Sequence, residues 1–126
     1  MLDKKIQRHL DLLIDRYPQL LNCKEDIEKA YLILEECYEN DHKLLIAGDG
    51  GSAADSEHIA GELMKRFKIQ RSIPSDFAKK LKEIDQTRGA DLANNLERGL
   101  MAIPLVAHEA LTTAYINDVD GLGVFA

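Results

Sequence analysis

The feature that most constrains the fold is a cluster of three glycines between a short apolar run and an amphipathic segment. The apolar run, residues 43–47, reads KLLIA, and the glycines stand at positions 48, 50 and 51. From position 52 the chain continues SAADSEHIAGELMKR. A short run of branched apolar side chains is typical of a strand buried on both faces. The sequence therefore predicts a strand, a loop and a helix in succession over residues 43–66.

The glycine loop predicts an anion site. Gly48, Gly50 and Gly51 allow the backbone to adopt positive φ and to approach a ligand closely. A helix that begins near Ser52 presents unpaired N–H groups and the positive end of its dipole, which favour a phosphate. The Ser52 hydroxyl is expected either to cap the helix toward Asp55 or to contact the ligand.

Two other phosphate motifs compete with this interpretation. A Walker P-loop requires a Lys-Ser or Lys-Thr pair after its last glycine, and none follows here. Residues 48–53, GDGGSA, do fit the dinucleotide pattern GxGxxG/A. That pattern requires an acidic residue about 20 positions on, at the end of a second strand. Residues 65–71 read KRFKIQR and offer neither, so a nicotinamide-dependent fold is a minor alternative.

The predicted helix carries a polar face. Asp55, His58 and Glu62 lie three and four residues apart, which places them on one side of a helix. A neighbouring apolar stripe is expected to face the core, and it consists of Ile59, Leu63 and Phe67. His58 and Glu62, one turn apart, can hold one divalent metal ion or hydrogen-bond to each other on a wet surface.

Two further amphipathic helices are expected in residues 1–40. The first apolar stripe ends at Pro18, and the second follows a capping box of Asn22 and Glu25 and ends at the turn Asn40–Asp41. The stripes consist of Leu2, Ile6, Leu10, Leu13 and Tyr17, and of Ile27, Ala30, Tyr31, Leu34 and Tyr38.

Two segments carry a family resemblance. GDGGSAADSEHIAGELMKRF resembles the signature of the phosphoheptose isomerases of the sugar isomerase (SIS) superfamily, and residues 102–118, AIPLVAHEALTTAYIND, resemble the family's second strand, the helix after it and an Asn-Asp pair. The resemblance implies an α/β fold, a three-layer αβα sandwich with a parallel sheet after an N-terminal helical pair. It implies one SIS domain over residues 1–126, with the helical pair in 1–40 and the start of the sheet in 43–126.

The resemblance also implies a function. In that family a carboxylate moves a proton between C1 and C2 of a sugar phosphate through an enediol, converting sedoheptulose 7-phosphate to a heptose 7-phosphate. Glu62 matches this carboxylate, and His58 with Glu62 matches a zinc site whose other ligands come from elsewhere. The substrate-binding positions implied are Asp49, Gly50, Gly51, Ser52, Asn117 and Asp118. A carboxylate shielded from water has a raised pKa, which suits a base that accepts and returns a proton.

The other ligand-type side chains receive no role from the sequence. His9, His42 and His108 are read as structural, because nothing in their spacing singles any of them out. Cys23 and Cys37 lack a metal-type spacing and are read as reduced thiols.

The sequence departs from the family in three places. Asp49 stands where Asn is usual, which leaves the exact sugar open. Residues 68–99 form a longer, charged connection, in which Phe77, Leu81 and Ile84 predict one short helix and Leu92 with Leu96 another. Family members continue through a Ser/Thr-rich phosphate loop and a later helix that carries another His, so residues 1–126 are expected to represent roughly the first two-thirds of the domain.

Composition limits the partners. The formal net charge of −6 over 126 residues argues against nucleic acid, and no apolar run reaches the roughly 20 residues that span a membrane. A cytoplasmic protein that forms a homo-oligomer, a dimer or tetramer, is expected. The alternative class is a non-catalytic SIS module that binds a sugar phosphate or a protein, including the type that assembles on a replication initiator.

Overall fold

The computed structural model describes residues 2–126, which fall into two compact units that divide between His42 and Lys43. The first unit consists of helices. The second combines a small parallel sheet with helices. Among the described residues, no helix is both long enough and apolar enough to cross a membrane.

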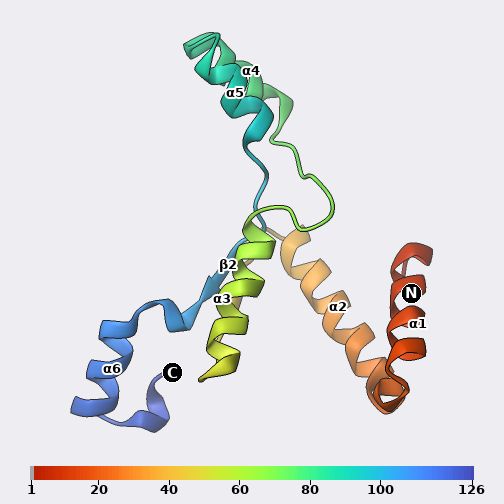
Figure 1. Ribbon diagram of the computed structural model, residues 1–126, viewed down its shortest axis with the longest axis vertical. Coiled ribbons are helices and arrows are strands. Elements are labelled where there is room, and N and C mark those ends of the chain that lie inside the picture. Colours follow the sequence, from red (N-terminus) through yellow and green to blue (C-terminus); the bar gives the residue numbers. More distant parts are fainter. Residues whose placement is uncertain (1) are drawn as a thin grey trace. The chain divides into compact units, whose positions relative to one another are not determined.

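The first unit contains the two predicted helices, joined by a 3-10 helix (Figure 1). Helix α1 spans Lys4–Arg16, the 3-10 helix η1 spans Pro18–Cys23, and α2 spans Lys24–Glu39. As predicted, α1 ends just before Pro18, and α2 ends at Asn40–Asp41, where Asp41 has a positive φ of 54°. The predicted capping box is wrong: Cys23 precedes α2 without a side-chain cap. The chain enters α2 directly from η1, and the N–H of Lys24 already donates to Leu21 O.

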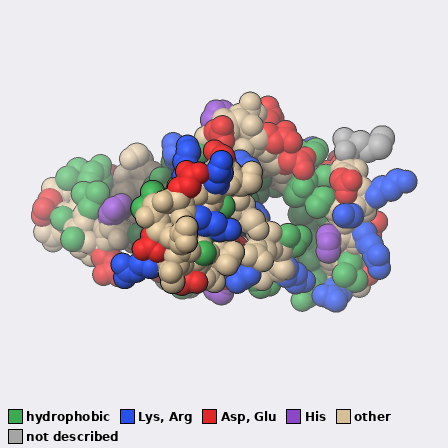
Figure 2. All heavy atoms as spheres, turned by 90° about the horizontal axis from the view of Figure 1, so that it is seen from above, with side chains coloured by type: hydrophobic (Ala, Val, Ile, Leu, Met, Phe, Trp, Pro, Cys, Tyr) green, Lys and Arg blue, Asp and Glu red, His purple; other side chains and the backbone are tan. Residues whose placement is uncertain are grey.

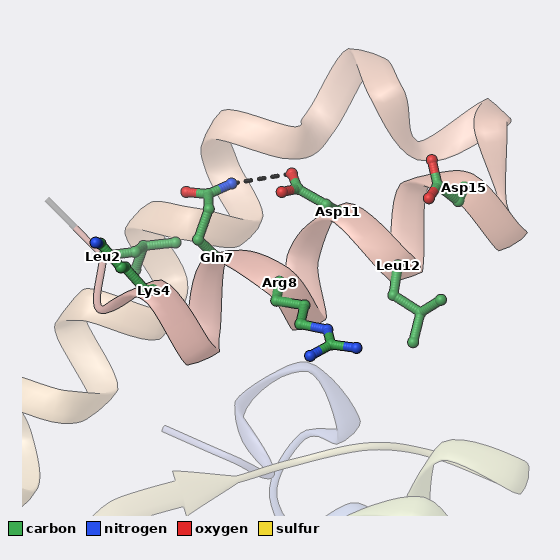
Figure 3. A pocket seen from close by; sticks show the side chains of 7 residues that line it. All are labelled: Leu2, Lys4, Gln7, Arg8, Asp11, Leu12 and Asp15. Carbon is green, nitrogen blue, oxygen red and sulfur yellow. Dashed lines mark hydrogen bonds between the residues drawn. The ribbon is translucent and has the colours of Figure 1, made fainter.

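An ion pair and a buried leucine join α1 to the rest of its unit. Leu10 is buried, and Lys24 Nζ lies 2.8 Å from Asp11 Oδ1. Figure 3 shows Asp11 on the pocket-lining face of α1, where it also accepts a hydrogen bond from Gln7. The hydrogen bond from Lys24, and then that from Gln7, lower the pKa of Asp11. None of the side chains drawn in Figure 3 belongs to the predicted sugar-phosphate site.

The second unit begins with the predicted strand, loop and helix. Strand β1 spans Leu44–Ile46 and α3 spans Gly51–Met64. After a helical hairpin the chain returns as β2, Ala102–Pro104, then η2, Leu105–Ala107, and α6, Glu109–Asp118, with a last 3-10 turn η3 at Gly121–Gly123. The two strands pair in parallel, with Leu44 opposite Ala102 and Ile46 opposite Pro104. The predicted α/β class with a parallel sheet is confirmed.

Small side chains make the contact between α3 and the sheet. Ser56, Ala60 and Ala102 are all buried, and α3 packs on β2. The predicted core stripe is wrong in two of its three members, because Ile59 and Phe67 are 46% and 73% exposed. Alanine and serine bring the helix axis close to the strand, so the larger side chains on the adjacent face remain outside.

One face of the sheet is open within the described residues of the second unit. Leu45 and its cross-strand partner Ile103 are 55% and 41% exposed. Successive side chains of a strand point to opposite faces, so α3 covers the face of Ala102 and leaves the other uncovered. The prediction that β1 is buried on both faces is therefore wrong for the described residues.

Residues 75–95 form the two short helices predicted for the charged connection. Helix α4 spans Ser75–Ile84, α5 spans Arg88–Asn95, and they pack against each other (Figure 1). The Asp85 carboxylate accepts hydrogen bonds from the N–H groups of Thr87 and Arg88 and so begins α5. Gly89 lies directly against the backbone of Leu81 and is buried. The hairpin is therefore held by a backbone-to-backbone approach that only glycine allows.

Candidate functional site

The loop that begins α3 contains one glycine with positive φ rather than three. Gly50 has φ 58° and ψ −119°, and among the described glycines only Gly50 has a positive φ. Gly48 is glycine for a different reason, because a Cβ there would lie 2.5 Å from Ser52 O. Gly51 is the first residue of α3 and has open space around the position of a Cβ. The prediction of positive φ is therefore right at Gly50 and wrong at the other two.

The Ser52 hydroxyl closes the loop on itself. Ser52 Oγ accepts a hydrogen bond from Asp49 N and donates one to Asp49 O, each 2.9 Å long. The predicted cap toward Asp55 is not formed, because the turn at Gly50 folds the Asp49 peptide back over Ser52. Within the described chain the N–H groups of Gly50 and Gly51 donate to no protein acceptor. Two donors at a helix N-terminus are thus open to an anion.

His58 and Glu62 lie together on α3, as their spacing predicts. His58 Nε2 is 3.6 Å from Glu62 Oε1, and the same oxygen lies 2.8 Å from Lys65 Nζ. The His58 side chain is 75% exposed and that of Glu62 is 27% exposed. Glu62 Oε2 is buried and has no hydrogen-bond partner among the described residues. Glu62 therefore has one oxygen held by a cation and one oxygen left without a partner.

The geometry of this pair fits two ligands of one zinc ion. A nitrogen and an oxygen bound tetrahedrally to zinc lie about 3.4 Å apart, close to the 3.6 Å observed. The unpartnered Oε2 adds a further acceptor. No group of three or more ligand-type side chains gathers anywhere in residues 2–126, so this chain offers at most half of a tetrahedral set.

Backbone carbonyls at the end of α3 are fixed by a distant arginine. Arg71 Nη2 donates to Leu63 O at 2.6 Å and to Lys65 O at 2.9 Å, while Arg71 Nε donates to Arg98 O at 2.9 Å. All three are charge-assisted bonds, and the two to Leu63 and Lys65 lie at the negative end of the α3 dipole. Arg71 thus holds the turn that carries Glu62 and joins it to the segment leading into β2.

A second ion pair lies beside this arginine. Arg66 Nε is 2.9 Å from Glu97 Oε1, and the Glu97 side chain is 8% exposed. Glu97 also forms an isolated bridge with Ser72. The segments that lead into and out of the helical hairpin are therefore both joined to the residues at the C-terminal end of α3.

Asn117 and Asp118 lie at the end of α6, one helix after β2. Asn117 Nδ2 donates to Asp118 Oδ1 at 2.7 Å, and both residues are exposed. Within the described residues no hydrogen bond or ion pair joins them to Glu62 or to the glycine loop. The structure brings together His58 and Glu62, and separately Asp49 and Ser52.

The sequence interpretation missed Lys65 and Arg71. Lys65 follows Glu62 by three residues, a spacing that brings opposite charges together on a helix, so this pair had a readable signal. Arg71 reaches Arg98 across 27 residues, and no local pattern indicates such a contact.

Comparison with known proteins supports the resemblance. The model of the SIS domain family matches residues 16–113. A phosphoheptose isomerase of Helicobacter pylori (strain ATCC 700392 / 26695) is 44% identical over 103 residues, which cover 82% of this chain and 40% of that protein. One of Aneurinibacillus thermoaerophilus is 56% identical over 50 residues, 39% of this chain and 25% of that protein. One of Trichlorobacter lovleyi is 38% identical over 68 residues, 54% of this chain and 33% of that protein.

These matches span less than half the length of the relatives, and no solved structure matches the chain. The family match covers most of the described α/β unit and includes the glycine loop, His58 and Glu62. The chain belongs to the SIS domain family.

Proposed function

We propose that this chain carries the proton-transfer base of a sugar phosphate isomerase, and that the base is Glu62. The observation that carries the proposal is the state of its carboxylate, which has one buried oxygen without a hydrogen-bond partner among the described residues and lies one turn after His58. The relatives named phosphoheptose isomerase support the same reaction class.

The length of α3 favours a long sugar phosphate. The rise from Gly51 to Glu62 is about 16 Å, and a helical side chain leans back toward the N-terminus by about one turn. A phosphate on the free N–H groups of Gly50 and Gly51 would therefore lie roughly 11 Å from the carboxylate. An extended seven-carbon chain with a terminal phosphate spans about 10 Å, whereas a three-carbon sugar phosphate is too short. Sedoheptulose 7-phosphate is the substrate that we propose.

The reaction needs one base and no redox partner. Glu62 removes the proton from C1 of the ketose, and an enediolate with its negative charge on O2 forms as the C1–H bond breaks. The same carboxylate returns a proton to C2, while the hydroxyl proton passes from O1 to O2, which gives the aldose. The Gly50 and Gly51 N–H groups hold the phosphate at the start of the helix, next to the Ser52 hydroxyl, which is bonded to the backbone of Asp49.

We propose that a zinc ion assists the base Glu62. His58 and Glu62 would supply two of its ligands, and the remaining ligands would have to come from elsewhere, because no third ligand-type side chain of the described residues gathers beside this pair. When bound, zinc would polarise the sugar's carbonyl and hydroxyl oxygens and stabilise the negative charge of the enediolate.

Isotope exchange tests the base. Sedoheptulose 7-phosphate is incubated in heavy water with the longest chain that the gene encodes, and deuterium at C2 of the aldose is measured. We expect Glu62→Gln to lower the exchange rate by about 10²- to 10⁴-fold with sugar-phosphate binding largely kept. Glu57→Gln, a change on an exposed position of the same helix, should leave exchange unchanged. Full exchange in Glu62→Gln would exclude this base, and binding without any exchange in the unmodified protein would favour the non-catalytic SIS module.

A further inference from the structure

The ammonium group of Lys65 forms an ion pair with the Glu62 oxygen that lies nearest to His58. Lys65 Nζ is 2.8 Å from Glu62 Oε1, and His58 Nε2 is 3.6 Å from the same atom. Neither Arg66 nor Lys68 takes this position, because Arg66 pairs with Glu97 and Lys68 lies over the ring of Phe67. Lys65 is thus the cation bound to the Glu62 carboxylate in the described chain.

The backbone of Lys65 is held by two hydrogen bonds, and its side chain is largely exposed to solvent. Its N–H donates to Gly61 O at 3.1 Å, and its carbonyl accepts from Arg71 at 2.9 Å. The side chain is 64% exposed. A fixed backbone keeps the ammonium within reach of Glu62, and an exposed four-carbon stem lets it withdraw into water.

A divalent cation between His58 and Glu62 cannot coexist with this ion pair at low cost. Such an ion would lie about 2.1 Å from Oε1, while Nζ lies 2.8 Å from that atom. The two cations would then be less than about 5 Å apart, a distance at which a double and a single charge repel measurably even in water. Repulsion between the two cations therefore lowers the affinity of the pair for a metal ion while the ammonium stays on Oε1.

We propose that Lys65 is an internal competitor for the divalent-cation site formed by His58 and Glu62. Its ammonium stabilises the Glu62 carboxylate in the metal-free chain and lowers the affinity of the site for metal. This inference rests on the proposed function in one respect, namely that His58 and Glu62 bind a metal ion.

Zinc titration of purified protein tests this without any assay of activity. Zn²⁺ affinity is measured by competition with a chromophoric chelator for the unmodified chain and for Lys65→Met. We expect Lys65→Met to bind Zn²⁺ about tenfold more tightly, because one nearby positive charge is removed. Lys65→Arg keeps the charge and should bind as the unmodified chain does. Lys68→Met removes a charge from the same segment without touching Glu62 and is the matched control.

A His58→Ala variant separates the failure of this inference from the failure of the metal site itself. Equal affinities in Lys65→Met and the unmodified chain, with binding lost in His58→Ala, would overturn the role of Lys65 and leave the metal site standing. Weaker binding in Lys65→Met would also overturn it. Zinc binding that is absent throughout, or unchanged in His58→Ala, would overturn both the competitor and the metal part of the proposed function.

Discussion

The backbone of Gly50 has φ 58° and ψ −119°, a combination that residues with side chains avoid. Two positions earlier, the backbone of Gly48 is ordinary, but the carbonyl of Ser52 fills the space that a side chain would need. Gly51 has neither restriction. At the residue scale, the sequence therefore reports a tight turn correctly but does not reveal which glycine is required for conformation and which for space.

This difference predicts unequal effects of alanine at the three glycines. We expect Gly50→Ala to lower the free energy of unfolding by about 1–3 kcal/mol through backbone strain. Gly48→Ala should cost a similar amount, roughly 1–3 kcal/mol, because Ser52 must shift. Gly51→Ala should be neutral or stabilising by up to about 1 kcal/mol, since it adds a better helix former in open space. Urea unfolding of the three variants measures these values.

Binding of inorganic phosphate provides the second readout of the same variants. The amide signals of residues 50–52 should shift with phosphate in the unmodified chain and in Gly51→Ala, and shift less in Gly48→Ala and Gly50→Ala. A loop that binds phosphate equally well in all four proteins would show that its backbone geometry does not make the anion site.

At the element scale, helices with a clear apolar repeat could be predicted from the sequence. The stripes of α1 and α2 and the repeats at Phe77–Ile84 and Leu92–Leu96 all correspond to helices, with α5 ending just before Leu96. The buried face of α3 could not be predicted, because its contacts come from Ser56 and Ala60, which a hydrophobicity pattern ranks below Ile59 and Phe67. The three carbonyl contacts of Arg71 depend on tertiary structure and leave no local pattern.

Substitution by alanine at two helical glycines is expected to change the stability in opposite directions. Gly89 of α5 lies against the backbone of Leu81 in α4, so an added methyl group must push the two helices apart. We expect Gly89→Ala to lower the free energy of unfolding by about 1–3 kcal/mol. Gly61 of α3 has no neighbouring atom within 4 Å of an added Cβ. Gly61→Ala should therefore stabilise by about 1 kcal/mol through helix propensity.

Thermal unfolding of both variants, followed by circular dichroism, tests this contrast. Gly61→Ala is the control for adding a methyl group to a helix without a steric conflict. A Gly89→Ala protein as stable as the unmodified chain would mean that the approach of α5 to Leu81 is not required for the hairpin.

At the scale of the whole molecule, the described chain buries little of its apolar side-chain surface. Among the hydrophobic side chains of residues 2–126, only Leu10, Ala60 and Ala102 are buried. Figure 2 shows green hydrophobic side chains at the surface on the face that it presents, among Lys and Arg side chains and Asp and Glu side chains. The net charge of −6 results from charges of both signs, and its repulsion does not by itself prevent self-association of the chain.

The open face of the sheet predicts self-association of the chain. Leu45 and Ile103 form an apolar cross-strand pair on a sheet face that no described element of the second unit covers, and the two-stranded sheet also leaves strand edges unpaired. Exposed apolar patches of this kind mark surfaces that bind other chains. We therefore expect a dimer or tetramer at micromolar concentration, with a sedimentation mass at least twice that of one chain.

Charge placed on this face tests whether it takes part in the association. Leu45→Glu should raise the dissociation constant by at least about tenfold, because the buried carboxylate would lose its hydration without gaining a partner. Ile84→Glu, at an exposed position of α4 in the hairpin, serves as the matched control and should leave the mass unchanged. A well-behaved monomer of the unmodified chain would contradict the association. An oligomer that persists unchanged in Leu45→Glu would place the interface elsewhere, because a glutamate cannot be buried at the centre of an apolar contact without weakening it.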